Sequence, residues 1–263
     1  MKVYVMTDME GISGVCRREH VMHDGALYGE GRRYLTLDVN ACVDGCFAGG
    51  ADAVTVVDAH SGRGDNFLWE ELDPRGEYIM GDAGARRMPG IREHDALILL
   101  GFHAMAGTPE AIMEHTMSSA SWQNFWLNDR LTGEIGVEAA IGGENGVPTV
   151  MVSGDDKACR EAEEFIPGVL TACVKWGLSV YGGKLLSPDR AHRLVRDTAK
   201  EAVRKAPEME PYVIEPPITA RLEKVSRGRL PVHETNPHVR ILDGRTYEAT
   251  GDSVEQALWR ISR

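Results

Sequence analysis

The sequence predicts an α/β fold in three layers (α/β/α), with a largely parallel central sheet and a smaller α+β part at the C-terminus. Apolar strand-like runs alternate with helix-like stretches over residues 1–186, which is the βαβ pattern of a parallel sheet. The runs "AVTVV" and "ALILL" are continuously apolar, as expected for central strands that helices cover on both faces. After residue 186 the pattern changes to an amphipathic helix and short strands. We therefore expect one domain over residues 1–186 and a smaller one over residues 187–263.

The expected elements follow from local patterns along the chain. Four apolar runs ending in polar residues predict strands over residues 2–8, 52–60, 95–104 and 148–156. The segment "SASWQNFWLNDRLTG" predicts a hairpin about "NDR". Helical periodicity predicts helices over residues 30–49, 134–146, 155–165 and 187–205, the last with Ser187 as N-cap and Pro188 at its first position. The C-terminal part should add strands within residues 215–226 and 239–250 and a closing helix over residues 253–263.

Composition limits the classes of function. The formal charge of −11, from 40 acidic and 29 basic residues, argues against a nucleic-acid partner, which needs clustered Lys and Arg. The sequence shows neither an apolar run near 18 residues nor an N-terminal leader, so we expect a cytoplasmic protein without a membrane partner. The five cysteines lack CxxC spacing, which argues against a disulfide framework and a thiolate zinc site.

Ligand-type side chains follow three of the expected strands. Asp8 and Glu10 come after "VYVMT", His60 after "AVTVVDA" and His103 after "ALILLGF". Because the carboxyl ends of parallel strands share one edge of a sheet, we expect these side chains to meet in one crevice. Imidazole and carboxylate without thiolate suit zinc, manganese or a related ion. Each residue alone is weak evidence, but three independent strands point to the same edge.

Three further polar residues are candidates, and two of them are open to two interpretations each. Glu134 either binds metal or, as the first residue of a helix, interacts favourably with the positive end of the helix dipole. His115 has no local motif, and Asp58 either orients a ligand or ends its strand as a turn residue. The remaining histidines lie in polar stretches, where solvated side chains are expected: His20, His23, His94, His192, His233 and His238.

Five segments in order resemble the zinc D-aminopeptidases of the DppA type. The resemblance covers roughly residues 1–190 and weakens toward the C-terminus. It is carried by the segments "TDMEGISG", "VVDAHS", "GFHAMAGTP…MEHTMS", "NDRLTGEIG" and "VMVSGDDKACREAEEFIP". Five ordered segments are far more specific than any one motif.

The resemblance implies a dinuclear zinc site in the first domain and hydrolysis of short peptides that begin with a D-residue, such as D-Ala. It carries over Asp8 as the ligand shared by two zinc ions, Glu10 and His60 for one ion, and His103 and Glu134 for the other. His115 matches the histidine with a catalytic role, as an acid–base group, an oxyanion stabiliser or a nucleophile. The resemblance also implies a homo-oligomeric ring, for which it suggests a decamer.

Two other functions are also compatible with the sequence. "VMTDMEG" is one residue from the strand-D-x-D-G motif of magnesium phosphatases of the haloacid dehalogenase type, but Glu10 stands where that family needs Asp. That alternative also leaves His60, His103 and Glu134 without a role. The other alternative is a non-catalytic protein that binds peptides or metal on an α/β scaffold. A ligand set without Cys suits an open catalytic centre better than a closed structural one.

Overall fold

The structure is a computed structural model that describes residues 1–62, 64–84, 86–228, 230–231 and 236–262. Its main sheet has seven strands, of which the first six in spatial order are parallel and the seventh is antiparallel. In that order they are β3 (Glu77–Ile79), β2 (Ala53–Asp58), β1 (Lys2–Thr7), β4 (Ala96–Phe102), β7 (Thr149–Asp155), β8 (Leu170–Ser179) and β9 (Gly182–Leu185). Every residue of β4 is buried, and so is every residue of β2 after Ala53, as the continuous apolar runs predicted.

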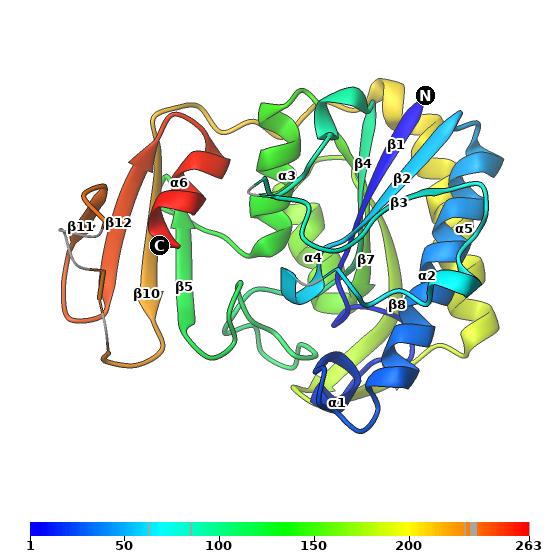
Figure 1. The fold of residues 1–263 in the computed structure, drawn as a ribbon, viewed down its shortest axis with the longest axis horizontal. Coiled ribbons are helices and arrows are strands. Elements are labelled where there is room, and N and C mark those ends of the chain that lie inside the picture. The colour runs from blue at the N-terminus through cyan, green and yellow to red at the C-terminus, as the bar shows by residue number, and fades with distance from the viewer. Residues whose placement is uncertain (63, 85, 229, 232–235, 263) are drawn as a thin grey trace.

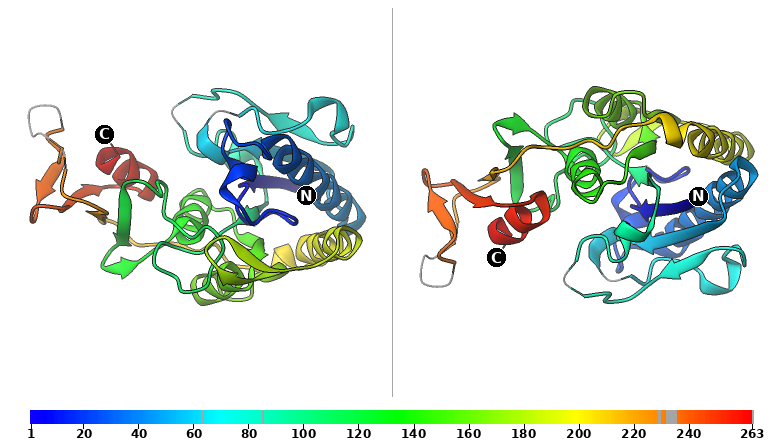
Figure 2. Two further views of the ribbon diagram at one scale, coloured as in Figure 1. Left: turned by 90° about the horizontal axis from the view of Figure 1, so that it is seen from below. Right: turned by 90° about the horizontal axis from the view of Figure 1, so that it is seen from above.

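Helices cover both faces of the main sheet (Figures 1 and 2). α2 (Tyr28–Gly49) and α5 (Pro188–Lys205) pack on one face, while α3 (Glu134–Glu144) and α4 (Asp156–Phe165) pack on the other. The predicted α/β fold with a largely parallel sheet between helices is therefore confirmed. The remaining short helices are α1 (Arg18–Val21) and 3-10 turns at His60–Gly62, Trp69–Glu71, Ile91–Glu93 and Ala206–Glu208. No helix among the described residues is long and apolar enough to cross a membrane.

A second sheet of five antiparallel strands lies beside the first (Figure 1). In spatial order it contains β11 (Val239–Ile241), β12 (Thr246–Gly251), β10 (Ile218–Lys224), β5 (Trp122–Leu127) and β6 (Arg130–Leu131). The expected hairpin is β5–β6, which turns at Asn128 and Asp129 with φ of 44° and 64°. α6 (Val254–Ile261) packs against this sheet. Ser253 caps the N-terminus of α6, where its side chain accepts a hydrogen bond from the Gln256 amide.

Both layers combine segments from the two sides of residue 186. α5 follows that residue but packs on α2, so closely that a Cβ at Gly45 would lie 2.2 Å from the Arg196 carbonyl oxygen. β5 precedes it but pairs with β10 in the second sheet. Ser187 is the N-cap residue of α5 with Pro188 at the first helical position, although the Ser187 side chain forms no cap hydrogen bond. The division into domains at residue 186 stays a prediction.

Candidate metal centre

The candidate site lies at the carboxyl edge of the main sheet, where the chain reverses its direction of winding. From β1 the chain continues to β2 on one side, whereas β4 lies on the other side of β1. Loops leaving two such strands diverge and leave a crevice between them, where open α/β sheets bind ligands. Asp8 follows β1 directly, His103 follows β4 directly and His60 follows the end of β2 by two residues. The expected convergence of these residues is present.

Two glycines hold the loop after β1 against the end of β4. The Asp8 amide donates to the Leu100 carbonyl at 2.9 Å, and the Gly11 amide donates to the Gly101 carbonyl at 2.7 Å. A Cβ at Gly11 would lie 2.0 Å from the Phe102 carbonyl oxygen, so no larger residue fits. Gly101 has a φ of 79°, a conformation that favours glycine. This contact keeps Asp8 and Glu10 next to His103.

A buried lysine supports the same loop from behind. Lys175 on β8 has no exposed surface, and its Nζ donates to the carbonyl oxygens of Glu10, Ile12 and Val15 at 2.5, 2.9 and 2.6 Å. Three acceptors satisfy all three protons of the ammonium group, which makes its burial tolerable. The backbone that carries Glu10 is thereby fixed from inside the protein.

The predicted ligands form one continuous cluster. The Nε2 atom of His60 lies 3.3 Å from Glu10 Oε1, and His103 Nε2 lies 3.3 Å from Asp8 Oδ2. His103 Nε2 is also 3.3 Å from Glu134 Oε1. Glu134 is the first residue of α3, as predicted. Ligand atoms of Asp8, Glu10 and His103 all lie within 4.8 Å of one another, as do those of His103, His115 and Glu134.

Four of the five predicted ligands each have one buried polar atom that lacks a hydrogen-bond partner in the described part of the chain. Among the described residues, such atoms include Asp8 Oδ2, Glu10 Oε2, His60 Nδ1 and His103 Nε2. Native proteins rarely leave buried polar atoms unpaired, because each costs about 1–3 kcal/mol. His103 Nδ1 donates to the Ala104 carbonyl at 3.0 Å, which leaves the lone pair of Nε2 directed at the carboxylates. Imidazole and carboxylate donors of this kind fit a zinc centre.

The charges in the cluster favour a cation. Burial, and then the charge of Glu10, raise the pKa of Asp8 to about 8. Burial also opposes ionisation of Glu10, but the neighbouring His60 holds the pKa of Glu10 well below its usual range. Burial lowers the histidine pKa values, yet the carboxylates outweigh it and raise the pKa of His60 to about 9 and that of His103 well above its usual value. Divalent cations can replace these protons when they bind.

His115 lies at the edge of the cluster with one ring nitrogen free to act. Its Nδ1–H donates to the Met113 carbonyl at 3.0 Å, and its Nε2 lies 3.7 Å from Glu134 Oε1. Burial, and then the charge of His103, lower the pKa of His115. The ring is therefore neutral near pH 7, with the lone pair of Nε2 available as a proton acceptor.

Asp58 does not bond to the His60 imidazole, as a carboxylate that orients this ligand directly would. Its two oxygens accept from the Asn66 backbone amide at 2.6 Å and the Asn66 side chain at 2.7 Å. Asn66 Nδ2 in turn donates to the His60 carbonyl at 3.1 Å. Asp58 thus holds the backbone at His60 through Asn66, rather than the imidazole ring itself.

The expectation that the other histidines are solvated is wrong for His20, and both ring nitrogens of His94 have protein partners, at Gly90 and Thr55. His20 is buried, at 6% exposure, and burial lowers its pKa. Its burial comes from contact with Tyr34 of α2, a contact that no local pattern reveals. His238 is exposed as expected, and His233 lies outside the described residues.

Three residues beside the cluster have no motif in the sequence. Arg87 Nη2 lies 3.6 Å from Glu134 Oε2, and Arg87 Nε donates to Glu138 Oε1 at 2.6 Å. Glu161 is 5% exposed and accepts a hydrogen bond from the Met105 amide at 2.7 Å. The only local signal was the i, i+4 spacing of Glu134 and Glu138 in an otherwise small and apolar helix, which places both carboxylates on one face.

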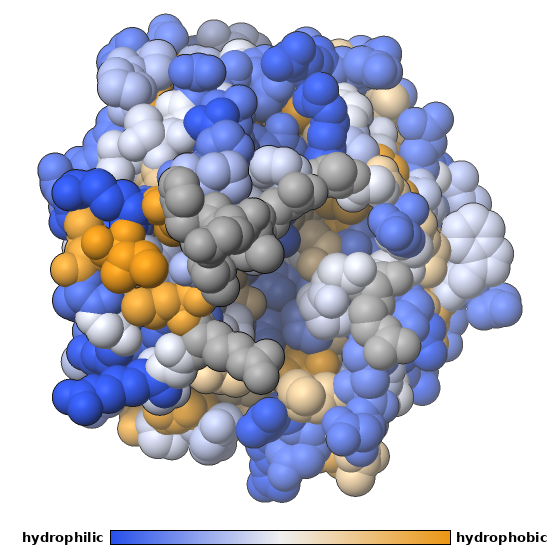
Figure 3. Space-filling model, turned by 60° about the vertical axis from the view of Figure 1, so that its left-hand side comes forward, coloured by the Kyte–Doolittle hydropathy of each residue, from blue (hydrophilic) through white to orange (hydrophobic). Residues whose placement is uncertain are grey.

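The cluster opens into a cavity of 820 Å³. Asp8, Glu10, His60, His115 and Glu134 all line it. Figure 3 shows one face of the molecule with a hollow near its centre, where the deepest visible side chains are hydrophilic. A cavity of this size accommodates a ligand as large as a short peptide.

Comparisons with known proteins agree with this geometry. A family model described as D-aminopeptidase matches residues 1–262. A D-aminopeptidase of Bacillus subtilis (strain 168) is 38% identical over 213 residues, which cover 80% of this chain and 77% of the relative. A solved structure, the zinc-dependent D-aminopeptidase DppA from Bacillus subtilis, superposes with a TM-score of 0.93 at 32% identity and covers 100% of this chain and 96% of its own. That protein is described as a self-compartmentalizing protease.

Proposed function

This chain belongs to the D-aminopeptidase family and is a zinc-dependent metallopeptidase, and we propose that it holds two zinc ions and removes N-terminal D-residues from short peptides. The observation that carries this proposal is the buried cluster of five ligand-type side chains, four of which have a donor atom without a hydrogen-bond partner among the described residues. A ligand atom of Asp8 lies within 4.8 Å of those of both Glu10 and His103. We assign Asp8 to both ions, Glu10 and His60 to one, and His103 and Glu134 to the other.

The protein's own residues would divide the work of hydrolysis. Zinc, when bound, supplies Lewis acidity that activates water and polarises the scissile carbonyl. His115 would accept at Nε2 a proton from the water that attacks the scissile carbonyl. It would then deliver this proton to the nitrogen of the leaving amine. The Nδ1–H bond to Met113 keeps the ring in the tautomer that this role needs. The lowered pKa of His115 keeps it unprotonated before attack.

The substrate assignment is tested with di- and tripeptides that differ only in the chirality of the first residue. Each peptide is assayed with protein loaded with zinc, manganese or magnesium. A phosphate monoester is assayed in parallel as the substrate of the phosphatase alternative. We expect zinc-loaded protein to cleave peptides that begin with D-Ala and to leave the ester intact. Ester cleavage with loosely held magnesium would favour the phosphatase alternative. Bound zinc without turnover of any substrate would favour the non-catalytic alternative.

The zinc count is tested by elemental analysis of the purified protein. We expect two ions for each chain after dialysis against metal-free buffer. One tightly held ion would contradict the dinuclear assignment but would leave a mononuclear peptidase in place.

We also propose that the chain assembles with copies of itself into a ring, for which a decamer is the expected form. Support comes from exposed apolar side chains at the β8–β9 hairpin, namely Leu178, Val180 and Tyr181, which are 69%, 40% and 58% exposed. Burying such a group against a neighbouring copy would stabilise an assembly. Light scattering should give a mass several times the 28.9 kDa of one chain. A monomer would refute the ring without affecting the chemistry.

A further inference from the structure

Glu138 is a buried carboxylate that the proposed reaction does not use. It lies one helical turn after Glu134 on α3, and its side chain has no exposed surface. Oε1 accepts from Arg87 Nε at 2.6 Å, while Oε2 has no hydrogen-bond partner among the described residues. A buried ionised carboxylate is costly unless a cation compensates it. Glu138 therefore depends on Arg87.

Arg87 contacts both carboxylates of this helix face. Its Nη2 lies 3.6 Å from Glu134 Oε2. The other oxygen of Glu134, Oε1, accepts from the Met117 amide at 2.7 Å and faces His103 Nε2 at 3.3 Å. The two oxygens thus have different surroundings, with Arg87 on one and Met117 and His103 on the other.

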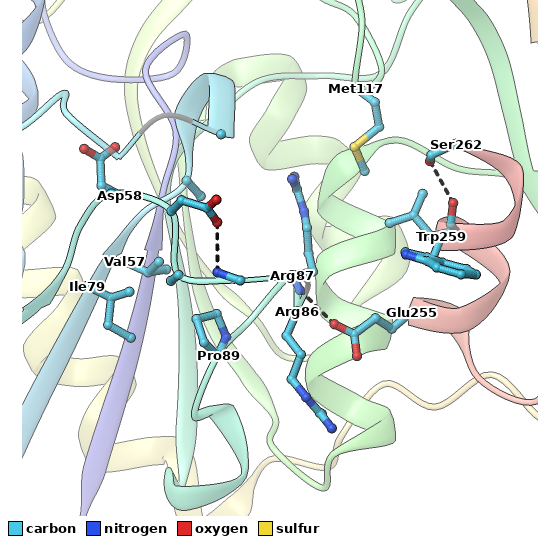
Figure 4. Close-up of a pocket in the computed structure, with 17 residues that line it drawn as sticks. Val57, Asp58, Ile79, Arg86, Arg87, Pro89, Met117, Glu255, Trp259 and Ser262 are labelled. Atoms are coloured by element: carbon cyan, nitrogen blue, oxygen red, sulfur yellow. Dashed lines mark hydrogen bonds between the residues drawn. The ribbon is translucent and has the colours of Figure 1, made fainter.

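The backbone of Arg87 is itself held in place. Its amide donates to Glu255 Oε1 of α6 at 2.7 Å. Figure 4 shows the Arg87 side chain extending toward Met117, whereas the side chain of Arg86 extends in the opposite direction. The residues drawn in Figure 4 line a second cavity, of 350 Å³. Arg87 lines both this cavity and the 820 Å³ cavity of the candidate metal centre. Arg87 therefore stands at the boundary between the C-terminal helix and the metal centre.

We infer that Arg87 is a positioning residue, which Glu138 holds in place and which orients Glu134 so that Oε1 faces the His103 half of the metal centre. This inference rests on the proposed function. Arg87 and Glu138 have opposite charges, so the pair fixes the direction of Glu134 without reducing the negative charge that attracts cations. A guanidinium group can contact two carboxylates through separate nitrogens, which a lysine ammonium cannot do in the same geometry.

A purely structural role is the alternative. Arg87 would then only fasten the segment before Met88 to α3, and its loss would lower stability without changing metal binding. The two roles differ in what they do to the affinity of one ion. Residues that orient metal ligands typically change metal affinity or activity by about 10–100-fold when they are replaced.

The experiment compares Arg87→Ala, Arg87→Lys and the control Arg86→Ala in the full chain. Zinc affinity is measured by competition with a chelator, and cobalt-substituted protein is examined by visible absorption. We expect Arg87→Ala to fold, to bind one of the two ions about 10–100-fold more weakly and to change the cobalt spectrum. Arg87→Lys should recover part of that affinity, and Arg86→Ala should match the wild type.

Wild-type zinc affinity and an unchanged cobalt spectrum in Arg87→Ala would overturn the inference, whatever its melting temperature. If Arg87→Ala does not fold, full zinc affinity in Arg87→Lys overturns it instead. These results would leave the proposed function intact as long as the wild type binds zinc and cleaves D-peptides. A wild-type chain that binds no zinc would refute the proposed function and this inference together.

Discussion

The imidazole of His115 stacks on that of His103, with ring centroids 3.9 Å apart and planes inclined by 13°. The two rings differ in their surroundings, because His103 is 2% exposed and faces two carboxylates, whereas His115 lines the cavity. Stacking orients His115 while its Nδ1–H bond to Met113 fixes its tautomer. The arrangement brings the proposed metal ligand His103 and the proposed proton carrier His115 together as one pair of stacked rings.

His115→Ala should therefore keep zinc and fold but lose rate. Removing one positioned acid–base group typically costs about 10²–10⁴ in rate. The loss should fall in kcat as much as in kcat/KM, because the interaction is made in the transition state. Zinc content, melting temperature and D-dipeptide kinetics check this, with the exposed His238→Ala as control. Near-normal kcat in a folded, zinc-loaded His115→Ala variant would remove His115 from the mechanism.

Asp8→Ala should lose both zinc ions and nearly all activity, since we assign this carboxylate to both. His60→Ala and His103→Ala should each affect mainly one ion. Elemental analysis of the three variants after identical dialysis gives the stoichiometry directly. Full zinc content in Asp8→Ala would show that the assignment to both ions is wrong.

Lys175→Met should destabilise the protein by about 3 kcal/mol, because each buried carbonyl oxygen left unpaired costs about 1–3 kcal/mol and removal of a buried charge offsets part of that. The three carbonyls belong to Glu10, Ile12 and Val15, so zinc affinity should fall as well. Urea unfolding and zinc competition measure the two effects. Lys205→Met on the exposed surface of α5 should change neither, and equal behaviour of the two variants would contradict the role of Lys175.

Glu161→Gln should alter how stability depends on pH. Burial, as the largest cause, raises the pKa of Glu161 to about 7, from 4.5 in an unfolded chain. Between these values the native state keeps a proton that the unfolded state releases, so this group makes the free energy of unfolding fall as pH rises. This fall in the free energy of unfolding is complete near pH 7 and amounts to at most about 3 kcal/mol.

Urea unfolding of wild type and Glu161→Gln from pH 4 to pH 8, both without zinc, isolates this group by subtraction. The variant should gain stability relative to the wild type as pH rises through the window and should show a constant difference above it. A difference that does not change with pH would mean that Glu161 ionises normally in the native state.

In the main sheet, the strands that could be predicted from the sequence are those with apolar runs, namely β1, β2, β4 and β7. β8 was not predicted, because Lys175 interrupts the run "LTACVKWGL" and reads as a solvent-facing residue. The burial of Lys175 is explained by the three carbonyl groups that accept from its Nζ, which lie about 160 positions earlier in the chain. β3 has three residues and gave no pattern to detect. Local patterns identify elements whose environment is uniform and miss those whose environment is made by distant partners.

The residues of the candidate site also divide into those that the sequence predicts and those that depend on distant partners. Asp8, Glu10, His60 and His103 could be predicted because parallel strands bring their carboxyl ends to one edge regardless of the details of packing. Arg87 could not, since it meets Glu138 across 51 positions and no motif marks either residue. The resemblance to a family located Glu134 and His115, whose own sequence contexts left two interpretations open.

The pairing of β5 with β10 has a consequence for the newly made chain. Asn128, directly after β5, and its partner Thr219 are 91 positions apart. At about 5–20 residues per second, the ribosome needs on the order of 5–20 s to make the intervening segment. During that time the hairpin has an open edge to which another nascent chain can add a strand. Slow synthesis or crowded polysomes should therefore favour aggregation through β5, before the peptidase has its second sheet.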